Sequence, residues 1–338
     1  MKAAVIGSGA WGTALALLLA RNKHDVVIWS HDPRIAETIN KDHENTELFR
    51  GVELPPSVSA TTNLEDAVRG AELVILVVAS RFFRQTLTAL LPLIGNVRVL
   101  LSATKGMDPD TDDSPVEMAE HMLPTDRKHI FAVLSGPNIA REIASGKPAT
   151  TVVASHHEPT ALLAQEYLST PEFRVYTNDD VAGIELGGTL KNIIAIAAGI
   201  LDGMELGVNA RAALVVRGMV EMVRFGTHFG ARPETFAGLA GMGDLIATCS
   251  SPMSRNHTVG EKLAKGLKLK EILEQMNAVA EGVETTARIH RIATEKGIEM
   301  PVTAQVHAIL FEDKPVKQAI YDLMTRDLKS ESPASSGA

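Results

Sequence analysis

The chain has 338 residues, a formal net charge of −8, 45% hydrophobic residues and 22% charged residues. This length is sufficient for two domains with their own cores, and the composition is ordinary for a soluble globular protein. The acidic balance, the 4% aromatic content and the lack of a basic block argue against nucleic acid as a partner. The single cysteine excludes an internal disulfide and fits a reducing, cytoplasmic location.

The first predicted unit is a strand, a glycine-rich turn and a helix. Lys2–Ile6 is a short apolar run of the kind found in buried parallel strands. The sequence GSGAWG (residues 7–12) follows, and then an alanine- and leucine-rich helical segment. This order is the dinucleotide-binding fingerprint. Gly7 permits the tight turn, Gly9 lets the backbone approach a pyrophosphate, and Gly12 lets the helix pack close to the strand.

The same N-terminal residues also share features with a secretory signal peptide. Three glycines interrupt the apolar run, however, and Lys2 is the only positive residue before it. Cleavage would also remove the first strand of a unit whose second strand follows at once. We therefore expect a cytoplasmic protein rather than a secreted one.

Apolar runs recur along the first half of the chain, with helical segments between them. We predict further strands at Asp25–Trp29, Leu73–Val78, Arg98–Ser102, Ile130–Leu134, Thr151–Ala154 and Arg174–Tyr176. Continuous apolar strands that alternate with helices indicate a parallel sheet covered on both faces. Ligands bind such sheets at the carboxyl ends of the strands, so the residues after each strand are candidates for a site.

Three of these strand ends carry residues suited to a ligand. Phe82 and Phe83 follow the third strand, where they either cover a nicotinamide or begin a core helix. Lys105 follows the fourth strand, where it either meets an anion or is a solvated loop residue. The turn Ser135-Gly136-Pro137-Asn138 follows the fifth strand, and its backbone amides are placed to hold a polar ligand.

From about residue 178 the strand pattern gives way to long helical segments. We expect a Rossmann-like α/β domain with a parallel sheet over 1–178, an all-helical domain over 179–328 and a disordered tail over 329–338. The longest wholly apolar helical run, near 193–201, is too short to span a bilayer. No integral membrane segment is therefore expected.

Lys191 is the first candidate for chemistry in the helical region. It follows Gly187 and Gly188, which weaken a helix and suggest close approach by another segment, and it stands among apolar residues on both sides. Burial disfavours a charged ammonium and lowers its pKa, as a lysine acid/base near neutral pH requires. The same pattern also fits a lysine that reaches from an amphipathic face to solvent.

Two later motifs carry charge on polar turns. Asp244 ends the glycine-rich sequence GMGD, and Arg255 lies within Ser254-Arg255-Asn256. The forked guanidinium of arginine suits bidentate phosphate recognition, although a lone loop arginine is commonly a surface residue. We expect no metal, because the histidines show no ligand spacing and the calcium-like run 108–113 lacks glycine at its sixth position. Cys249 shows no sign of an activated thiolate.

Taken together, the motifs resemble the bacterial glycerol-3-phosphate dehydrogenases that use NAD or NADP. The resemblance extends from Gly7 to about Leu323. Its motifs are GSGAWG (7–12), ATKG (103–106), SGP (135–137), LGG and KNIIA within 186–195, NAR (209–211), GMGD (241–244), SRN (254–256) and VAEG (279–282).

The family resemblance implies reversible hydride transfer between NAD(P)H and C2 of dihydroxyacetone phosphate, which gives sn-glycerol 3-phosphate for phospholipid synthesis by a homodimer. It implies that Lys191 is the general acid/base and that Lys105 touches both cofactor and substrate. The implied substrate contacts are Lys105, Gly136, Asn138, Lys191, Asp244, Ser254, Arg255 and Asn256. The implied cofactor contacts are Gly7, Gly9, Ala10, Trp11, Gly12, His31, Lys105, Ala140, Arg255, Val279 and Glu281.

The chain departs from the family pattern at three places. Asn138 stands where Ser or Thr is usual, Ala10 replaces a more typical Ser or Asn, and Leu48-Phe49-Arg50 replaces the usual aromatic-Leu-Pro. The first departure puts the substrate contact of Asn138 in question, and the second leaves Ala10 with a backbone contact. None of the three touches Lys191.

The chemistry agrees with these implied roles. A ketone reduction needs a hydride on carbon, which the cofactor supplies, and a proton on oxygen, which a positioned ammonium can donate while it polarises the carbonyl. Asp244 would orient Lys191, and Arg255 would hold the phosphate. Two other classes share part of the pattern. A ketopantoate reductase-like enzyme has no need of Arg255, and a nucleotide-sensing protein has no use for Lys191.

Overall fold

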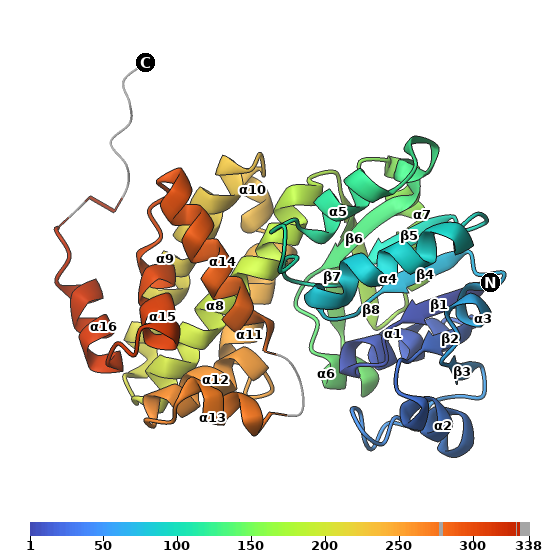
Figure 1. Ribbon diagram of the computed structural model, residues 1–338, viewed down its shortest axis with the longest axis horizontal. Coiled ribbons are helices and arrows are strands. Elements are labelled where there is room, and N and C mark those ends of the chain that lie inside the picture. The colour runs from blue at the N-terminus through green and yellow to red at the C-terminus, as the bar shows by residue number, and fades with distance from the viewer. Residues whose placement is uncertain (277–279, 329, 332–338) are drawn as a thin grey trace.

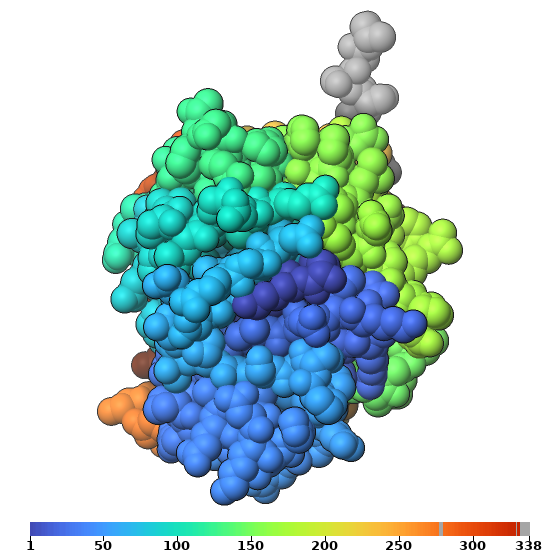
Figure 2. All heavy atoms as spheres, turned by 90° about the vertical axis from the view of Figure 1, so that its right-hand side faces the viewer, coloured from blue at the N-terminus to red at the C-terminus, as the bar shows by residue number. Residues whose placement is uncertain are grey.

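The computed structural model describes residues 1–276, 280–328 and 330–331. An N-terminal α/β domain built on one sheet lies beside a C-terminal helical domain (Figure 1). Figure 2, which faces the side of the sheet domain, is filled mainly by the blue-to-green residues of that domain. The predicted disordered tail lies outside the described residues except for 330–331.

An eight-stranded sheet with the order β3-β2-β1-β4-β5-β6-β7-β8 forms the centre of the N-terminal domain. Its strands are β1 (Lys2–Ile6), β2 (Asp25–Trp29), β3 (Val58–Thr61), β4 (Leu73–Leu76), β5 (Val99–Ser102), β6 (Phe131–Ser135), β7 (Ala149–Ala154) and β8 (Phe173–Asn178). The first strand is central, because Ala3 pairs with Val26 of β2 and with Leu73 of β4. This position buries both faces of β1, which explains its continuous apolar run.

The sheet differs from the prediction in two respects. β7 runs antiparallel to β6, whereas the other neighbouring strands are parallel. Apolar runs reveal burial and carry no information on strand direction, so the predicted parallel sheet is confirmed at the other pairings and the antiparallel one was not foreseen. β3 was missed because this edge strand alternates between buried and more exposed residues and includes Ser59 and Thr61.

Helices cover both faces of the sheet. They are α1 (Ala10–Arg21), α2 (Pro33–Asp42), α3 (Leu64–Val68), α4 (Phe83–Leu90), α5 (Pro115–Met122), α6 (Ala140–Ala144) and α7 (Glu158–Leu168), with the short turns η1 (Ser80–Phe82), η2 (Leu91–Leu93) and η3 (Thr125–Ile130). Alternate residues of β1 belong to different cores. Ala3 and Val5 pack in the cluster that includes α1, and Ala4 and Ile6 pack in the cluster that includes α4.

The helical domain is assembled around its first and longest helix, α8. Its elements are α8 (Val181–Gly203), α9 (Gly207–His228), α10 (Pro233–Phe236), the π-type turn η4 (Leu239–Gly243), α11 (Asp244–Ser250), α12 (Arg255–Ala264), α13 (Leu269–Glu274), α14 (Glu281–Lys296), α15 (Pro301–Phe311) and α16 (Val316–Met324). α8 is longer than its apolar run predicted, and by length and hydropathy it could cross a membrane. However, 94% of its most apolar window is buried inside the protein, which is the pattern of a core helix.

Glycines allow α12 to cross α8 at very short distance. A Cβ on Gly199 of α8 would lie 1.9 Å from the carbonyl oxygen of His257, and a Cβ on Gly260 of α12 would lie 2.0 Å from that of Ile196. Any larger residue would force the helices apart. The crossing therefore fixes the start of α12, which carries Arg255, beside the C-terminal part of α8.

Candidate active site

The glycine-rich turn after β1 has the conformation that its sequence predicted. Gly7 has a φ of +128°, and a Cβ there would lie 2.7 Å from the carbonyl oxygen of Val77. A Cβ on Gly12 would lie 2.0 Å from the carbonyl oxygen of Gly7, so only glycine permits this contact between helix and strand. At Gly9, the N-cap of α1, a Cβ would lie within 4 Å of no atom of the described residues. The turn therefore presents an uncovered helix N-terminus, which suits a phosphate.

Lys191 lies at the centre of a buried polar cluster. Its side chain is buried in the middle of α8, and its Nζ donates to Asp244 Oδ1 and, at 2.6 Å, to Thr248 Oγ1. Lys105, from the loop after β5, donates to the other oxygen of the same carboxylate at 2.5 Å. Because Lys191 is only 6% exposed, the alternative of a lysine that reaches to solvent was wrong. Lys105 is likewise held by an ion pair, so it is not a solvated loop residue.

The environment moves the pKa of Lys191 toward neutral pH and that of Asp244 away from it. Burial lowers the pKa of Lys191 to about 8, with Asp244 opposing and Lys105 assisting the shift. Burial on its own would raise the pKa of Asp244, but the two lysines hold it below its usual value. Asp244 is therefore charged at neutral pH, and the Lys191 ammonium is able to lose its proton slightly above it.

The two glycines before Lys191 admit the segments that complete the cluster. A Cβ on Gly187 would lie 2.7 Å from the carbonyl oxygen of Ala240 in η4, the turn that leads to Asp244. A Cβ on Gly188 would lie 2.5 Å from Ser135 Oγ and 3.3 Å from Lys105 Cε. The close approach predicted at these glycines is thus made by η4 and by the ends of β5 and β6.

The turn after β6 lies against the same region. Pro137 approaches Gly243, the residue before Asp244, because a Cβ on Gly243 would lie 3.6 Å from the proline ring. The Asn138 side chain turns toward β7, where its Nδ2 donates to Thr151 Oγ1 at 2.8 Å. Its Oδ1 is buried and has no hydrogen-bond partner among the described residues. Gly136 packs on Thr151, and Ala140 begins α6 beside α1.

Arg255 and its neighbours approach from α12. Ser254 caps this helix by accepting from His257 N at 3.3 Å, and Asn256 Oδ1 accepts from Gly282 N at 3.0 Å. Arg255 is exposed and makes no hydrogen bond or ion pair within the part of the chain that is described. Although the residue as a whole is exposed, partial burial of its guanidinium lowers the pKa of Arg255, and the charge of Glu281 opposes that shift. A free guanidinium at this place is suited to an anion.

Glu281 links the two domains at the start of α14. Its carboxylate accepts from Ser80 Oγ at 2.7 Å and from Ser80 N at 3.3 Å, and Ser80 stands at the carboxyl end of β4. Burial raises the pKa of Glu281, although these two hydrogen bonds oppose the rise. Val279, the other predicted cofactor contact in this segment, lies outside the described residues.

Two residues of this region were missed by sequence reasoning. Thr248 stands four residues after Asp244 on α11, a spacing that places both on one helix face. Ser80 comes just after β4, and ligands bind sheets of this kind at the carboxyl ends of the strands, so its position could have marked it as a candidate. Of the adjacent phenylalanines, Phe83 is a fully buried core residue, as one alternative predicted, whereas Phe82 is 47% exposed. Cys249 is buried, and burial raises the pKa of its thiol to about 12, in agreement with an inert residue.

Comparison with known proteins places these features in a family. Residues 2–161 match the family described as NAD-dependent glycerol-3-phosphate dehydrogenase N-terminus, and residues 180–321 match the corresponding C-terminus. The glycerol-3-phosphate dehydrogenase [NAD(P)+] of Geobacter sulfurreducens is 48% identical over 97% of this chain and 98% of that protein.

Solved structures give the same result. The glycerol-3-phosphate dehydrogenase of Coxiella burnetii has a TM-score of 0.90 at 38% identity, covering 96% of this chain and 99% of that one. A ketopantoate reductase from Ralstonia eutropha shares the fold alone, with a TM-score of 0.57 at 18% identity over 96% of this chain and all of that one. The chain belongs to the NAD-dependent glycerol-3-phosphate dehydrogenase family.

Proposed function

We propose that this chain interconverts dihydroxyacetone phosphate and sn-glycerol 3-phosphate by hydride transfer with NAD(P)H. The observation that carries the proposal is the buried cluster of Lys191, Asp244 and Lys105, which lies where the carboxyl end of β5 meets α8. The open turn at Gly9 fits the pyrophosphate of a dinucleotide. Relatives that are named for this reaction and match along nearly the whole chain support it further.

In this proposal Lys191 is the general acid and base. Its ammonium polarises the C2 carbonyl and gives its proton to the oxygen as that oxygen becomes an alkoxide. Asp244 holds Nζ in place through Oδ1, and Thr248 accepts a second hydrogen bond. Bound NAD(P)H supplies the hydride to C2. In the reverse direction the neutral amine of Lys191 removes the proton from the C2 hydroxyl.

The remaining predicted residues divide between the two ligands. Lys105 lies between them, and Gly136, Asn138, Ser254, Arg255 and Asn256 would surround the substrate. The cofactor would contact Gly7, Gly9, Ala10, Trp11, Gly12, His31, Lys105, Ala140, Arg255, Val279 and Glu281. Among these, Asn138 has the weakest support, because its amide is bonded to Thr151.

The decisive experiment is a turnover assay with two substrates and two cofactors. The purified chain is given dihydroxyacetone phosphate or ketopantoate, each with NADH and with NADPH. We expect turnover with dihydroxyacetone phosphate only. Turnover with ketopantoate alone would favour the other enzyme class, and nucleotide binding without turnover of either ketone would favour a sensing protein.

Arg255→Ala is expected to lower kcat/KM for dihydroxyacetone phosphate by about one to two orders of magnitude. The reason is the loss of a charge-assisted contact to the phosphate, a type of contact that contributes roughly 1.5–3 kcal/mol. The fold should persist, because Arg255 is exposed and unpaired among the described residues. Arg217→Ala, at an exposed position of α9, is the matched control. Unchanged substrate binding in Arg255→Ala would show that the phosphate lies elsewhere.

NADPH is expected to serve as a cofactor alongside NADH. An NAD-selective site ends its second strand with an acid that binds the ribose 2′-hydroxyl, but β2 is followed here by the buried Ser30 and the exposed His31. The next acid, Asp32, caps α2 and is bonded at both oxygens by Arg34, and these bonds lower its pKa to about 2. Parallel kinetics test this, and an efficiency with NADPH more than about a hundredfold below that with NADH would contradict it.

The pH profile should report Lys191. With its pKa near 8, the ammonium needed for ketone reduction is present below pH 8 and is lost above it. We therefore expect kcat/KM for reduction to fall above about pH 8, and kcat/KM for oxidation to rise up to the same pH. Measurements between pH 7 and pH 10 avoid titration of the substrate phosphate, whose second pKa is about 6. A flat profile across pH 8 in both directions would contradict the assignment.

We also propose a cellular setting for the reaction. Production of sn-glycerol 3-phosphate would supply glycerophospholipid synthesis, in the cytoplasm, by a homodimer that binds no nucleic acid. Within each chain the division into domains would fall at residues 178 and 179, with the helical domain extending to 328. The exposed Val208 and Val216 stand eight residues apart on one face of α9 and are candidates for a contact between copies. Light scattering should give twice the mass of one chain.

A further inference from the structure

A loop held by both domains begins directly after Lys105. Residues 106–114, here named the clasp loop, are the part of the connection between β5 and α5 that follows Lys105. At the start of this loop, Gly106 N donates to Thr189 Oγ1 of α8 at 3.2 Å. The next residue, Met107, is buried in the hydrophobic cluster of the helical domain. The position of Lys105 is therefore tied to the position of this loop.

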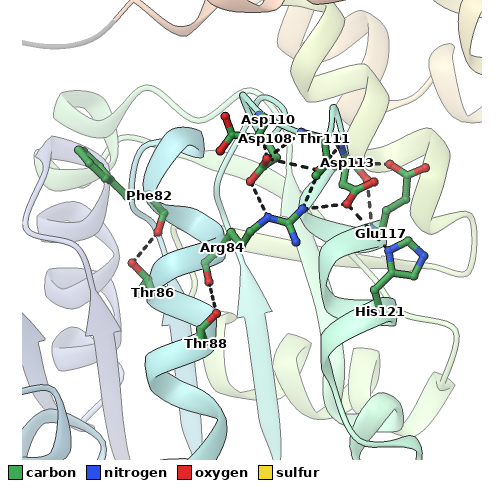
Figure 3. Close-up of polar contacts among 11 residues, drawn as sticks. Phe82, Arg84, Thr86, Thr88, Asp108, Asp110, Thr111, Asp113, Glu117 and His121 are labelled. Atoms are coloured by element: carbon green, nitrogen blue, oxygen red, sulfur yellow. Dashed lines mark hydrogen bonds and ion pairs between the residues drawn. The ribbon is translucent and has the colours of Figure 1, made fainter.

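On the sheet-domain side, one arginine of α4 holds the clasp loop. The Arg84 guanidinium points into the loop (Figure 3), where Nε donates to Asp108 Oδ2 at 3.0 Å. The same side chain donates to Thr111 Oγ1 at 2.6 Å and to Asp113 Oδ2 at 2.8 Å. Asp108 is almost fully buried, and its Oδ1 accepts from two backbone amides of the loop, those of Asp110 at 3.0 Å and Thr111 at 3.1 Å. These contacts make the loop a stiff unit.

On the helical side, the clasp loop is held through Asp112. This residue has a φ of +61°, and its carboxylate forms ion pairs with Arg291 and, at 3.8 Å, with Arg288 of α14. The Arg288 side chain is only 14% exposed, so the charges are partly shielded from solvent. Arg288 follows Glu281 by seven residues, or two helical turns, which places both on the face of α14 toward the sheet domain.

We propose that Asp112, Arg288 and Arg291 are positioning residues for the proposed reaction. In this arrangement the clasp loop connects α14 to Lys105, and Lys105 in turn fixes the carboxylate of Asp244 that orients Lys191. The path is short, because Asp112 N donates to Asp108 O at 3.1 Å and Asp108 is held by Arg84. The proposal rests on the proposed function, since it concerns the rate and pH dependence of that reaction.

This connection has an effect that a purely structural ion pair would lack. The titratable groups that act on Lys191 are Lys105 and Asp244. Lys191 in turn acts on the nearby thiol of Cys249, but burial raises the pKa of that thiol to about 12, so it stays protonated. Lys105 lowers the pKa of Lys191, and Asp244 raises it. If the loop relaxes, Lys105 withdraws from the cluster. Its repulsion of the Lys191 ammonium then weakens, and the carboxylate of Asp244 is left to Lys191 alone. Both changes raise the pKa of Lys191. The alkaline limb of kcat/KM for reduction then moves to higher pH.

The test compares two asparagine variants of the same loop. Asp112→Asn removes the charge and keeps a residue type that tolerates positive φ. Asp110→Asn makes the same change at an exposed side chain that has no hydrogen bond or ion pair among the described residues, and it serves as control. For each full-length variant, kcat, KM for dihydroxyacetone phosphate and their pH profiles are measured, together with the NADPH dissociation constant and Tm.

For Asp112→Asn we expect kcat/KM at neutral pH to fall about threefold to tenfold. We also expect the alkaline limb of kcat/KM for reduction to move to higher pH. Asp110→Asn should match the parent. Arg291→Gln should shift the limb in the same direction, and the double variant of Asp112 and Arg291 should be no worse than Asp112→Asn alone. NADPH stoichiometry on each preparation corrects for any unfolded fraction.

Two results would overturn the positioning role. One is that Asp112→Asn and Asp110→Asn have the same kcat and KM, and that kcat/KM for reduction falls at the same alkaline pH in both. The other is that Asp112→Asn has a lower Tm or less folded protein, while the pH at which kcat/KM for reduction falls stays unchanged. The ion pair would then have a structural role only. A parent without turnover would instead refute the proposed function, so the two failures are distinguishable.

Discussion

Lys191→Met is expected to lower turnover with dihydroxyacetone phosphate by at least about a hundredfold, because a positioned acid/base group contributes roughly 10²–10⁴ in rate. Methionine keeps much of the apolar stem and removes the proton donor. The buried carboxylate of Asp244 would not be left alone, since Lys105 remains bonded to it at 2.5 Å. Nucleotide binding should be nearly unchanged, because the turn at 7–12 is untouched.

Steady-state turnover and NADPH titration on one preparation measure both parts of this expectation. Lys270→Met, at a highly exposed lysine of α13, controls for the substitution itself. The folding stability of Lys191→Met should equal or slightly exceed that of the parent, because a buried charge has been removed. A variant that retains most of the parental turnover would show that Lys191 has no part in proton transfer.

Gly199→Ala should destabilise the protein by about 3 kcal/mol or more, although alanine in a helix is ordinarily better than glycine by about 0.5–1 kcal/mol. The sign is reversed because the new Cβ would lie 1.9 Å from the carbonyl oxygen of His257. Backbone in a packed helix cannot yield as a flexible side chain does, so α8 and α12 must separate. Arg255 would then move away from Lys191, and activity should fall together with stability.

Denaturant unfolding of the parent and the variant measures this effect. Gly95→Ala is the control, because a Cβ there would meet no atom within 4 Å in the part of the chain that the structure describes, and its stability should stay within about 0.5 kcal/mol of the parent. If Gly199→Ala is as stable as the parent, the close crossing of α8 and α12 is not the constraint described above.

The sequence predicted the α/β class and the helical second domain because both depend on local patterns. The turn at 7–12 requires glycine at positions 7 and 12 for steric reasons, and this requirement is visible in the sequence. Strand direction at β7 is not a local property, and the edge strand β3 lacks the apolar run that marks a buried one. These two features required the three-dimensional structure.

The candidate site was only partly accessible to the same reasoning. The apolar neighbours of Lys191 were compatible both with burial and with a side chain that reaches to solvent, and the structure decides for burial. Its partner Thr248 depends on how α11 packs on α8. The bond between Ser80 and Glu281 joins residues that are far apart in the chain, and no spacing rule connects them. The ion pair of Arg34 with Asp32, which bears on cofactor choice, was likewise outside what composition could indicate.

The sharing of one carboxylate by two lysines has a consequence for substrate choice. Lys105 and Lys191 contribute two positive charges and Asp244 one negative charge, so the buried cluster carries a net charge of +1 when no ligand is bound. An anionic ketone compensates this excess on binding, whereas a neutral ketone of the same shape leaves it in place. Unphosphorylated dihydroxyacetone should therefore bind more weakly than dihydroxyacetone phosphate for two reasons. It lacks the contacts that the phosphate makes, and it leaves the positive charge of the buried cluster uncompensated.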